Sequence, residues 1–348
     1  MLKATYFKRV FQFNFKARTS RGLMKDKVSW FICLSRDDNP DVVGIGECGP
    51  LPGLSVDAVP HFEDVLMEII GRIAKQSTLE ELLDLVPPGF PSIVFALETA
   101  WYDLTNGGKR IIFNNGFVQG KKIPINGLIW MGDLDFMMSQ INQKIAQGFR
   151  CIKLKVGGLD FDRECDVIQY LRNRYFRDNI EIRLDANGAF KLDEALYKLG
   201  ELAKFTIHSI EQPIKPGQPE MEELCRKSPI PVALDEELIG VAGTKRNALL
   251  MNLKPHFIIL KPTLHGGLSG CEDWIRCATN LGIAWWITSA LESNVGLNAI
   301  CQFTANYDVQ ISQGLGTGSI YLNNFDSPLT VEGGFIFSDT HKAWAAIQ

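Results

Sequence analysis

The stretch IEIRLDANGAFKLDEALYKLGELAKFTIHSIEQP, residues 180–213, decides the fold class. A short apolar run at its start ends in Asp185, and a second apolar run at its finish ends in Glu211. The residues between the two runs are amphipathic, with apolar positions at helical spacing. A strand, a helix and a strand in this order predict a βαβ unit, whose two strands lie parallel in one sheet.

The same alternation of short apolar runs and longer amphipathic stretches extends from about residue 121 onward. Eight such runs favour a barrel of the (β/α)8 type, in which some helices can be missing or altered. The runs are residues 123–129, 151–156, 180–184, 207–210, 232–234, 257–260, 284–288 and about 309–313.

The first 120 residues have a different character and predict a mixed α+β module. Residues 4–15 alternate between apolar and polar, as in a half-buried strand. Ser92 is a suitable N-cap for a helix that follows Pro91. We expect further strands at Trp30–Leu34 and Val42–Gly46, helices at 56–75 and 92–104, and loops at 17–27 and 47–55.

Composition excludes several classes of protein. The 348 residues carry 36 Lys and Arg against 40 Asp and Glu, and this mild acidity argues against a nucleic-acid-binding protein. The eight cysteines form no CxxC pair, so neither a zinc ribbon nor a disulfide framework is expected. No run approaches 18 apolar residues and charges interrupt the N-terminal stretch, so we expect no membrane span, no secretory signal and, by default, a cytoplasmic protein.

Charged or polar residues stand at the ends of the apolar runs, at intervals of 24–30 residues. The carboxyl ends of barrel strands converge on one mouth, where the active sites of this fold lie. Residues far apart in the sequence therefore become neighbours in one site. They are Lys153, Lys155, Arg183, Asp185, Asn187, Glu211, Asp235, Glu236, Lys261, Ser289 and Ser293.

Lys153 and Lys155 point to the same face of their strand, because side chains alternate along a strand. Two ammonium groups on one face repel each other, and a like charge lowers the pKa of a lysine. A lowered pKa makes a lysine usable as a base near neutral pH. We therefore expect proton abstraction by this pair.

Three carboxylates, Asp185, Glu211 and Asp235, end adjacent strands, with no His or Cys among them. Such a set of hard oxygen ligands favours Mg²⁺ or Mn²⁺ over zinc. A divalent ion stabilises the dianionic enediolate that forms when a proton is removed next to a carboxylate. The lysines and acids together predict this kind of chemistry.

The order and spacing of these motifs resemble the enolase superfamily, specifically its muconate-lactonizing-enzyme subgroup. The resemblance covers essentially the whole chain and rests on KLKVGG (153–158), RLDANGAF (183–190), IEQP (210–213), ALDEEL (233–238), ILKP (259–262) and SALES (289–293). Within the subgroup, GIGECGPLPGLS (44–55), PINGLIW (124–130) and TSALESNVGL (288–297) are most similar to the o-succinylbenzoate synthase family.

The resemblance implies a (β/α)7β modified TIM barrel at residues 121–321 and an α+β capping domain at residues 1–120. Residues 322–348 are then expected to return to the capping domain. The implied substrate is a small-molecule carboxylate, 2-succinyl-6-hydroxy-2,4-cyclohexadiene-1-carboxylate, which loses water to become o-succinylbenzoate in menaquinone synthesis. The oligomeric state stays open.

The resemblance also implies roles for the ionic side chains. Lys155 is the base, Lys153 assists it, and Lys261 stabilises the enediolate as a cation on the opposite face. The ligands of Mg²⁺, with Mn²⁺ as a second possibility, are Asp185, Glu211 and Asp235.

Substrate contacts compete with ordinary structural roles. Arg183 and Asn187 either touch the substrate or make an ion pair and a turn. Ser289 and Ser293 are expected to bind the succinyl carboxylate. Glu236 is either a hydrogen-bond partner of the site residues or a surface residue. The family's loops over the mouth correspond to residues 17–27 and 47–55, whose apolar contacts to a substrate ring are Leu23, Leu51 and Leu54.

Two related activities compete with dehydration. Dipeptide epimerases typically carry an Asp-x-Asp pair near the eighth strand, and residues 314–319 read GLGTGS with no Asp. N-succinylamino acid racemisation stays open, because its substrate carries the same succinyl group. Muconate cycloisomerisation has no positive support. A non-enzymatic descendant of the barrel is disfavoured, because the three acids and both principal lysines are present.

Overall fold

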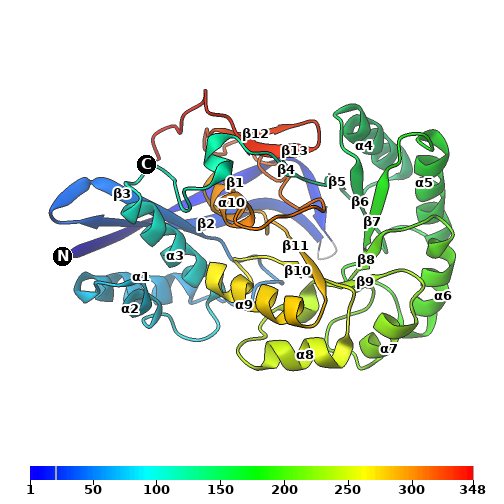
Figure 1. Ribbon diagram of the computed structural model, residues 1–348, viewed down its shortest axis with the longest axis horizontal. Coiled ribbons are helices and arrows are strands. Elements are labelled where there is room, and N and C mark those ends of the chain that lie inside the picture. The colour runs from blue at the N-terminus through cyan, green and yellow to red at the C-terminus, as the bar shows by residue number, and fades with distance from the viewer. Residues whose placement is uncertain (20–21, 348) are drawn as a thin grey trace.

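The computed structural model describes residues 1–19 and 22–347, and the side chains within these ranges except those of 16–19 and 23. Figure 1 shows an N-terminal part, coloured blue to cyan, next to a curled sheet whose strands alternate with helices on its outside. In the described residues, no helix is long and apolar enough to cross a membrane.

The N-terminal part contains a three-stranded antiparallel sheet of β1 (Leu2–Thr19), β2 (Gly22–Arg36) and β3 (Asn39–Cys48). The prediction of a loop at 17–27 was wrong, because β1 and β2 stay paired from Ala17–Met24 to Thr19–Gly22. The polar residues there, such as Lys25 and Asp26, are exposed on a long hairpin. An exposed ladder lacks the apolar alternation by which a half-buried strand is recognised.

One long helix, α3 (Pro91–Thr105), fills the space against β3 and is buried along most of its length. Gly44 and Gly46 permit this approach, since a Cβ at either would lie about 2 Å from a carbonyl oxygen of α3. Pro91 takes the first helical position, and the predicted cap Ser92 instead donates its hydroxyl to Asp57. The remaining helices of this part are α1 (Phe62–Arg72), η1 (Ile73–Lys75), α2 (Leu79–Leu83) and η2 (Gly116–Gln119).

Seven parallel strands form the curled sheet, in the order in which they follow along the chain (Figure 1). They are β5 (Gly127–Ile129), β6 (Cys151–Lys155), β7 (Glu181–Asp185), β8 (Ser209–Glu211), β9 (Val232–Leu234), β10 (Phe257–Leu260) and β11 (Ala284–Ile287). The helices between and after them are α4 (Leu134–Ala146), α5 (Phe161–Arg174), α6 (Leu192–Ala203), α7 (Glu220–Lys227), η3 (Glu236–Leu238), α8 (Lys245–Leu253), α9 (Gly267–Asn280) and α10 (Asn294–Thr304).

The eighth position of the barrel is taken by two residues only. Gln313 exchanges backbone hydrogen bonds with Pro124 and Asn126, and Gly314 does so with Ile287 and Ser289. Of the predicted run at 309–313, only Gln313 is paired with a neighbouring strand, and the pairing then continues to Gly314. The architecture is the predicted (β/α)7β modified TIM barrel.

The C-terminal tail divides between two neighbours. Residues 320–322 hydrogen-bond to β1, and Phe325 packs on Phe11 and Phe31 of the N-terminal sheet. The hairpin of β12 (Leu329–Glu332) and β13 (Phe335–Ser338) instead pairs with β4 (Ile123–Pro124), the short strand that precedes the barrel.

Two buried carboxylates of the N-terminal part accept hydrogen bonds from the first turns of barrel helices. Glu47 at the end of β3 accepts from the backbone of Ser293 and Gly296 at α10. Glu98 of α3 accepts from the backbone of Leu268 and Ser269 at α9. Because the first N–H groups of a helix have no partner inside it, these acids fasten the two parts together at the barrel mouth.

Candidate active site

The mouth of the barrel is built from strand ends that stand in register. Lys155 of β6 lies beside Asp185 of β7, which lies beside Glu211 of β8. Asp235 follows β9, and Lys261 follows β10. All five side chains are at least four-fifths buried, so the fold brings together the ionic residues that the sequence placed at its strand ends.

The ammonium groups and carboxylates pair directly. Lys153 Nζ lies 2.8 Å from Asp185 Oδ2 and 2.5 Å from Glu211 Oε2. Lys155 Nζ lies 2.6 Å from the same Asp185 oxygen. Lys261 Nζ donates to Asp235 Oδ2. Each lysine is therefore held by an acid of a neighbouring strand.

These pairs overturn the expectation that repulsion lowers the pKa of Lys153. Burial does oppose its charged form, but the charges of Asp185 and Glu211 outweigh that effect and raise the pKa of Lys153. In the same way burial opposes the charged form of Asp185, and the two lysines nonetheless hold its pKa well below the usual range. Two opposite charges within 3 Å count for more than one like charge two residues away.

Glu211 behaves differently from its neighbours. Burial and the nearby charge of Asp185 raise the pKa of Glu211 well above the ordinary value. Its Oε1 is buried and has no hydrogen-bond partner among the described residues, and the same holds for Asp235 Oδ1. A buried carboxylate oxygen without a partner is costly, so each of these atoms has room for a bond to a cation.

The donor set suits a hard divalent cation. It consists of three carboxylates from adjacent strands, two of which keep a buried oxygen unused. Within the described residues, no three acidic, His or Cys side chains already surround a common point as metal ligands do. One oxygen of each carboxylate is instead turned toward a lysine ammonium group, which supplies compensating positive charge.

Supporting residues hold the ionic groups in place. Asn187 accepts a hydrogen bond from Lys155 Nζ at 2.7 Å and donates to Glu236 Oε1 at 2.9 Å. Glu236 is thus behind Lys155 rather than on the surface. Asn187 has a positive φ of 43°, a conformation that Asn tolerates better than most residues.

Two supporting residues were missed by sequence reasoning. The Gln212 side-chain oxygen accepts from the backbone N–H of Asp235 and of Glu237. His265 Nδ1 accepts from the backbone N–H of Lys261 at 3.0 Å, and burial lowers the pKa of this histidine to about 3, which keeps it neutral. The four-residue interval from Lys261 to His265 is the only signal in the sequence.

The two predicted serines take different positions. Ser289 lines the cavity at the barrel mouth, where its hydroxyl donates to Glu292 and accepts from Thr317. Ser293 caps α10 and donates its hydroxyl to Glu47, so it faces the N-terminal part and not the cavity. Ser293 therefore fastens the two parts together, and it is not among the residues that line the cavity.

Arg183 lies below the mouth of the barrel. It is 2% exposed, donates to Glu181 and to the carbonyl of Ser312, and stacks over the ring of Trp286. The side chain runs toward the amino end of its strand, because Glu181 attracts it there. The expected substrate contact is therefore not supported, and Arg183 has the structural role that was its alternative.

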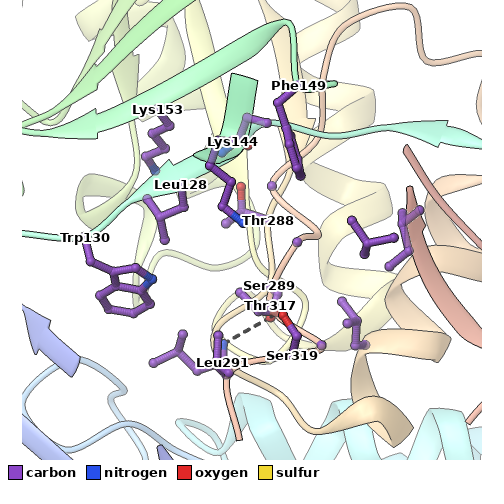
Figure 2. Close-up of a pocket in the computed structure, with 18 of the residues that line it drawn as sticks. Leu128, Trp130, Lys144, Phe149, Lys153, Thr288, Ser289, Leu291, Thr317 and Ser319 are labelled. Atoms are coloured by element: carbon purple, nitrogen blue, oxygen red, sulfur yellow. Dashed lines mark hydrogen bonds between the residues drawn. The ribbon is translucent and has the colours of Figure 1, made fainter. Parts of the chain in front are cut away.

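A cavity of about 860 Å³ opens over the ionic groups. Lys153, Lys155, Lys261, Asp185 and Asn187 lie on its floor, and Leu51, Leu54, Trp130 and Leu291 form apolar walls. Figure 2 shows Ser289, Thr317 and Ser319 grouped on one side of the cavity and Lys153 with Leu128 on another. The side chain of Leu23 is outside the described residues.

Comparison with known proteins identifies the family. Residues 137–340 match the family model described as enolase C-terminal domain-like. The chain is 42% identical to an o-succinylbenzoate synthase of Desulfotalea psychrophila, over 93% of this chain and 95% of that protein. The crystal structure of MenC from Desulfotalea psychrophila LSv54 superposes with a TM-score of 0.86 at 40% identity, covering 97% of this chain and 99% of that one.

More distant structures share the fold. A dipeptide epimerase from Cytophaga hutchinsonii, complexed with Mg and a dipeptide, matches with a TM-score of 0.83 at 18% identity, over 96% of this chain and 92% of that one. The near relatives carry the family assignment, because they align over almost their whole length. This chain belongs to the o-succinylbenzoate synthase family of the enolase superfamily.

Proposed function

We propose that this chain dehydrates 2-succinyl-6-hydroxy-2,4-cyclohexadiene-1-carboxylate to o-succinylbenzoate, a step in menaquinone biosynthesis. The observation that carries the proposal is the mouth of the barrel, where three lysines face three buried carboxylates. This arrangement stands in a chain that is 42% identical to an o-succinylbenzoate synthase.

Asp185, Glu211 and Asp235 would hold the divalent cation, Mg²⁺ or, as a second choice, Mn²⁺. The unused buried oxygens of Glu211 and Asp235 support this assignment. When bound, such a cation acts as a Lewis acid toward the substrate carboxylate and stabilises the charge that develops on its oxygens. The related dipeptide epimerase of Cytophaga hutchinsonii was crystallised with Mg.

Lys155 is the base of the proposed reaction. Its Nζ takes the proton from the ring carbon next to the carboxylate, and the electron pair of that C–H bond moves into the carboxyl group to form an enediolate. The enediolate then expels the hydroxyl group, which leaves as water with the proton that Lys155 returns. One C–H and one C–O bond break, one C=C bond forms, and the product ring becomes aromatic.

Lys153 and Lys261 assist electrostatically. Lys153 shares Asp185 Oδ2 with Lys155 and so fixes the carboxylate that orients the base. Lys261 is charged, because Asp235 and Glu211 raise its pKa although burial opposes this. A fixed cation on the other side of the substrate stabilises the enediolate without a proton transfer.

Racemisation of N-succinylamino acids is the second candidate. It is favoured by the presence of two lysines, Lys155 and Lys261, on strands from opposite parts of the curled sheet. A pair of lysines so placed can remove a proton from one face of a carbon and return it to the other.

Two assays separate the candidates. The synthase substrate should be converted with the appearance of aromatic absorbance, activity should disappear with EDTA, and Mg²⁺ should restore it. Racemisation of N-succinylamino acids should instead appear as loss of optical activity accompanied by exchange of the α-hydrogen in D₂O. A chain that fails to convert the cyclohexadiene substrate in the presence of Mg²⁺ is not a synthase, whatever its exchange activity.

A further inference from the structure

The cations of the cavity differ in how their charge is compensated. Lys144, Lys153, Lys155 and Lys261 line the cavity. The last three pair with buried carboxylates at the barrel mouth. Within the described residues, no acidic side chain lies within ion-pair distance of Lys144. Its described interaction is with the face of Phe149, whose ring centre lies 5.0 Å from Nζ.

The base of the Lys144 side chain is packed against the barrel. Lys144 stands near the end of α4, and a Cβ on Gly127 of β5 would lie 3.2 Å from the Lys144 Cβ. The base of the side chain therefore packs on the barrel, and burial lowers the pKa of its ammonium. A half-buried cation without a counter-ion loses hydration and gains no charge pair in return.

The Lys144 side chain is directed into the cavity. Figure 2 shows it running from its helix toward Thr288, between Leu128 on one side and Phe149 on the other. Thr288 Oγ1 is itself buried and has no hydrogen-bond partner among the described residues. A cation and a hydroxyl that both lack partners thus line one cavity.

Among the described residues that line this part of the cavity, none forms an ion pair or a hydrogen bond with the Lys144 ammonium. Glu332 also lines it, but this residue is exposed and its nearest cation is Lys122 at 3.8 Å. Gln140 is occupied on both sides of its amide by the backbone of Trp130. An anionic group of a molecule in the cavity would supply the counter-charge that Lys144 lacks.

We propose that Lys144 determines specificity by receiving the carboxylate at the end of the substrate's succinyl chain, with the Thr288 hydroxyl as a second donor. This inference rests on the proposed function, whose substrate carries two carboxylates. The ring carboxylate belongs to the three acids and their lysines. Ser289 is a poor donor for the other carboxylate, because its hydroxyl already donates to Glu292.

The test compares two ligands that differ only in the terminal carboxylate. These are the product o-succinylbenzoate and 2-butyrylbenzoate, in which a methyl group replaces that carboxylate. Their affinities are measured by calorimetry in the presence of Mg²⁺ for the wild type, K144M and K144R. K144M should weaken the binding of o-succinylbenzoate about 10- to 100-fold, as expected for loss of a charge-assisted hydrogen bond. K144M should change the affinity for 2-butyrylbenzoate less than about twofold. K144R should keep most of the wild-type affinity for o-succinylbenzoate.

Q143M is the matched control, since Gln143 is the adjacent residue of α4 and also lines the cavity. It should leave the preference between the two ligands unchanged. Equal affinities of K144M and wild type for o-succinylbenzoate would overturn the inference. So would an equal loss for both ligands, because that would indicate a packing role.

Steady-state kinetics of the wild type and K144M distinguish a failure of this inference from a failure of the proposed function. K144M should raise KM for the cyclohexadiene substrate by the same factor and change kcat less than about threefold. A wild type without dehydratase activity refutes the proposed function. A wild type that is active while K144M keeps its KM refutes only the role of Lys144.

Discussion

At the scale of single residues, exposure distinguishes the three lysines of the mouth. The Lys155 side chain is 18% exposed, against 9% for Lys153 and 11% for Lys261. Lys155 is also held by a neutral partner, Asn187, in addition to one carboxylate oxygen. The lysine that is most open to the cavity is therefore the best placed to meet a substrate proton.

The first prediction concerns this lysine. Lys155→Ala should lower kcat by about 10⁴-fold, the upper part of the range for loss of a general base. The protein should still fold, because Lys153 continues to compensate Asp185. Steady-state kinetics and circular dichroism check both parts. Lys204→Ala, at an exposed lysine, is the control, and a near wild-type rate for Lys155→Ala would exclude it as the base.

Much of the site was predictable at this scale. Ionic residues at strand ends are visible in the sequence, because each follows an apolar run directly. The direction of the pKa shift of Lys153 was not predictable, since it depends on two carboxylates 2.8 Å and 2.5 Å away on other strands. Arg183 was misjudged for a similar reason, as the strand alternation gives the face of a side chain but not the end of the barrel toward which it bends.

At the scale of elements, the helices that follow the mouth depend on acids from another part of the chain. Glu98 supplies both oxygens to the first N–H groups of α9. Glu47 does the same for α10 and also accepts from Ser29 beside the buried Lys27. These contacts fix the loops that carry Lys261 and Ser289. The same contacts therefore stabilise the fold and position residues of the site.

The second prediction uses the titration of Glu98. Burial raises its pKa to about 7, from 4.5 in an unfolded chain. The folded state therefore binds this proton more tightly, and the free energy of unfolding falls as the pH rises from about 4.5 to 7. By this linkage Glu98 should contribute about 2–3 kcal/mol more at pH 5 than at pH 8.

Urea denaturation of the wild type and Glu98→Gln at pH 5 and pH 8 measures this contribution. The difference between the two proteins cancels the titration of all other groups. The free energy of unfolding of the wild type, relative to that of Glu98→Gln, should be higher at pH 5 than at pH 8. A difference that does not change with pH would show that Glu98 has an ordinary pKa in the folded protein.

The third prediction concerns Glu47. Glu47→Ala leaves the Lys27 ammonium buried, with 1% exposure, and removes the acceptor from the start of α10. Breaking a buried ion pair on one side costs about 3–5 kcal/mol. Thermal or urea denaturation should show that loss, and adding Lys27→Met should recover part of it. No recovery in the double variant would place the whole effect at the helix.

The elements themselves were predicted unevenly. Buried strands such as β7 and β10 appear where the apolar runs are, because both faces of a barrel strand avoid water. The sequence predicts a loop for the outer part of the β1–β2 hairpin, since exposed strands have polar residues on both faces. The hydrogen bonds from Glu47 and Glu98 to the barrel helices connect residues more than 160 positions apart, so no local pattern reveals them.

At the scale of the whole molecule, the barrel is closed at its seam by Gln313 and Gly314, and the cavity extends to this seam between α4 and the β12–β13 hairpin. The N-terminal part covers the mouth with Leu51 and Leu54, while the C-terminal tail ties β1 to the barrel. A ligand that contacts Leu51 or Leu54 as well as the barrel residues of the cavity would stabilise the association of the two parts.

The last prediction follows from this arrangement. A cation that binds the folded protein and not the unfolded chain stabilises it by about 2.7 kcal/mol at a concentration one hundred times its Kd. Mg²⁺ should therefore raise the Tm of the wild type in a concentration-dependent way. Asp185→Asn should reduce that rise and lower kcat together, because Asp185 is one of the three proposed oxygen ligands. Lys155→Ala should keep the rise while losing activity, and KCl at matched ionic strength separates site binding from screening. After treatment with EDTA, some concentrations of Mg²⁺ should restore activity. If none of these concentrations raises the Tm of the wild type, the assignment of the three acids as metal ligands is contradicted.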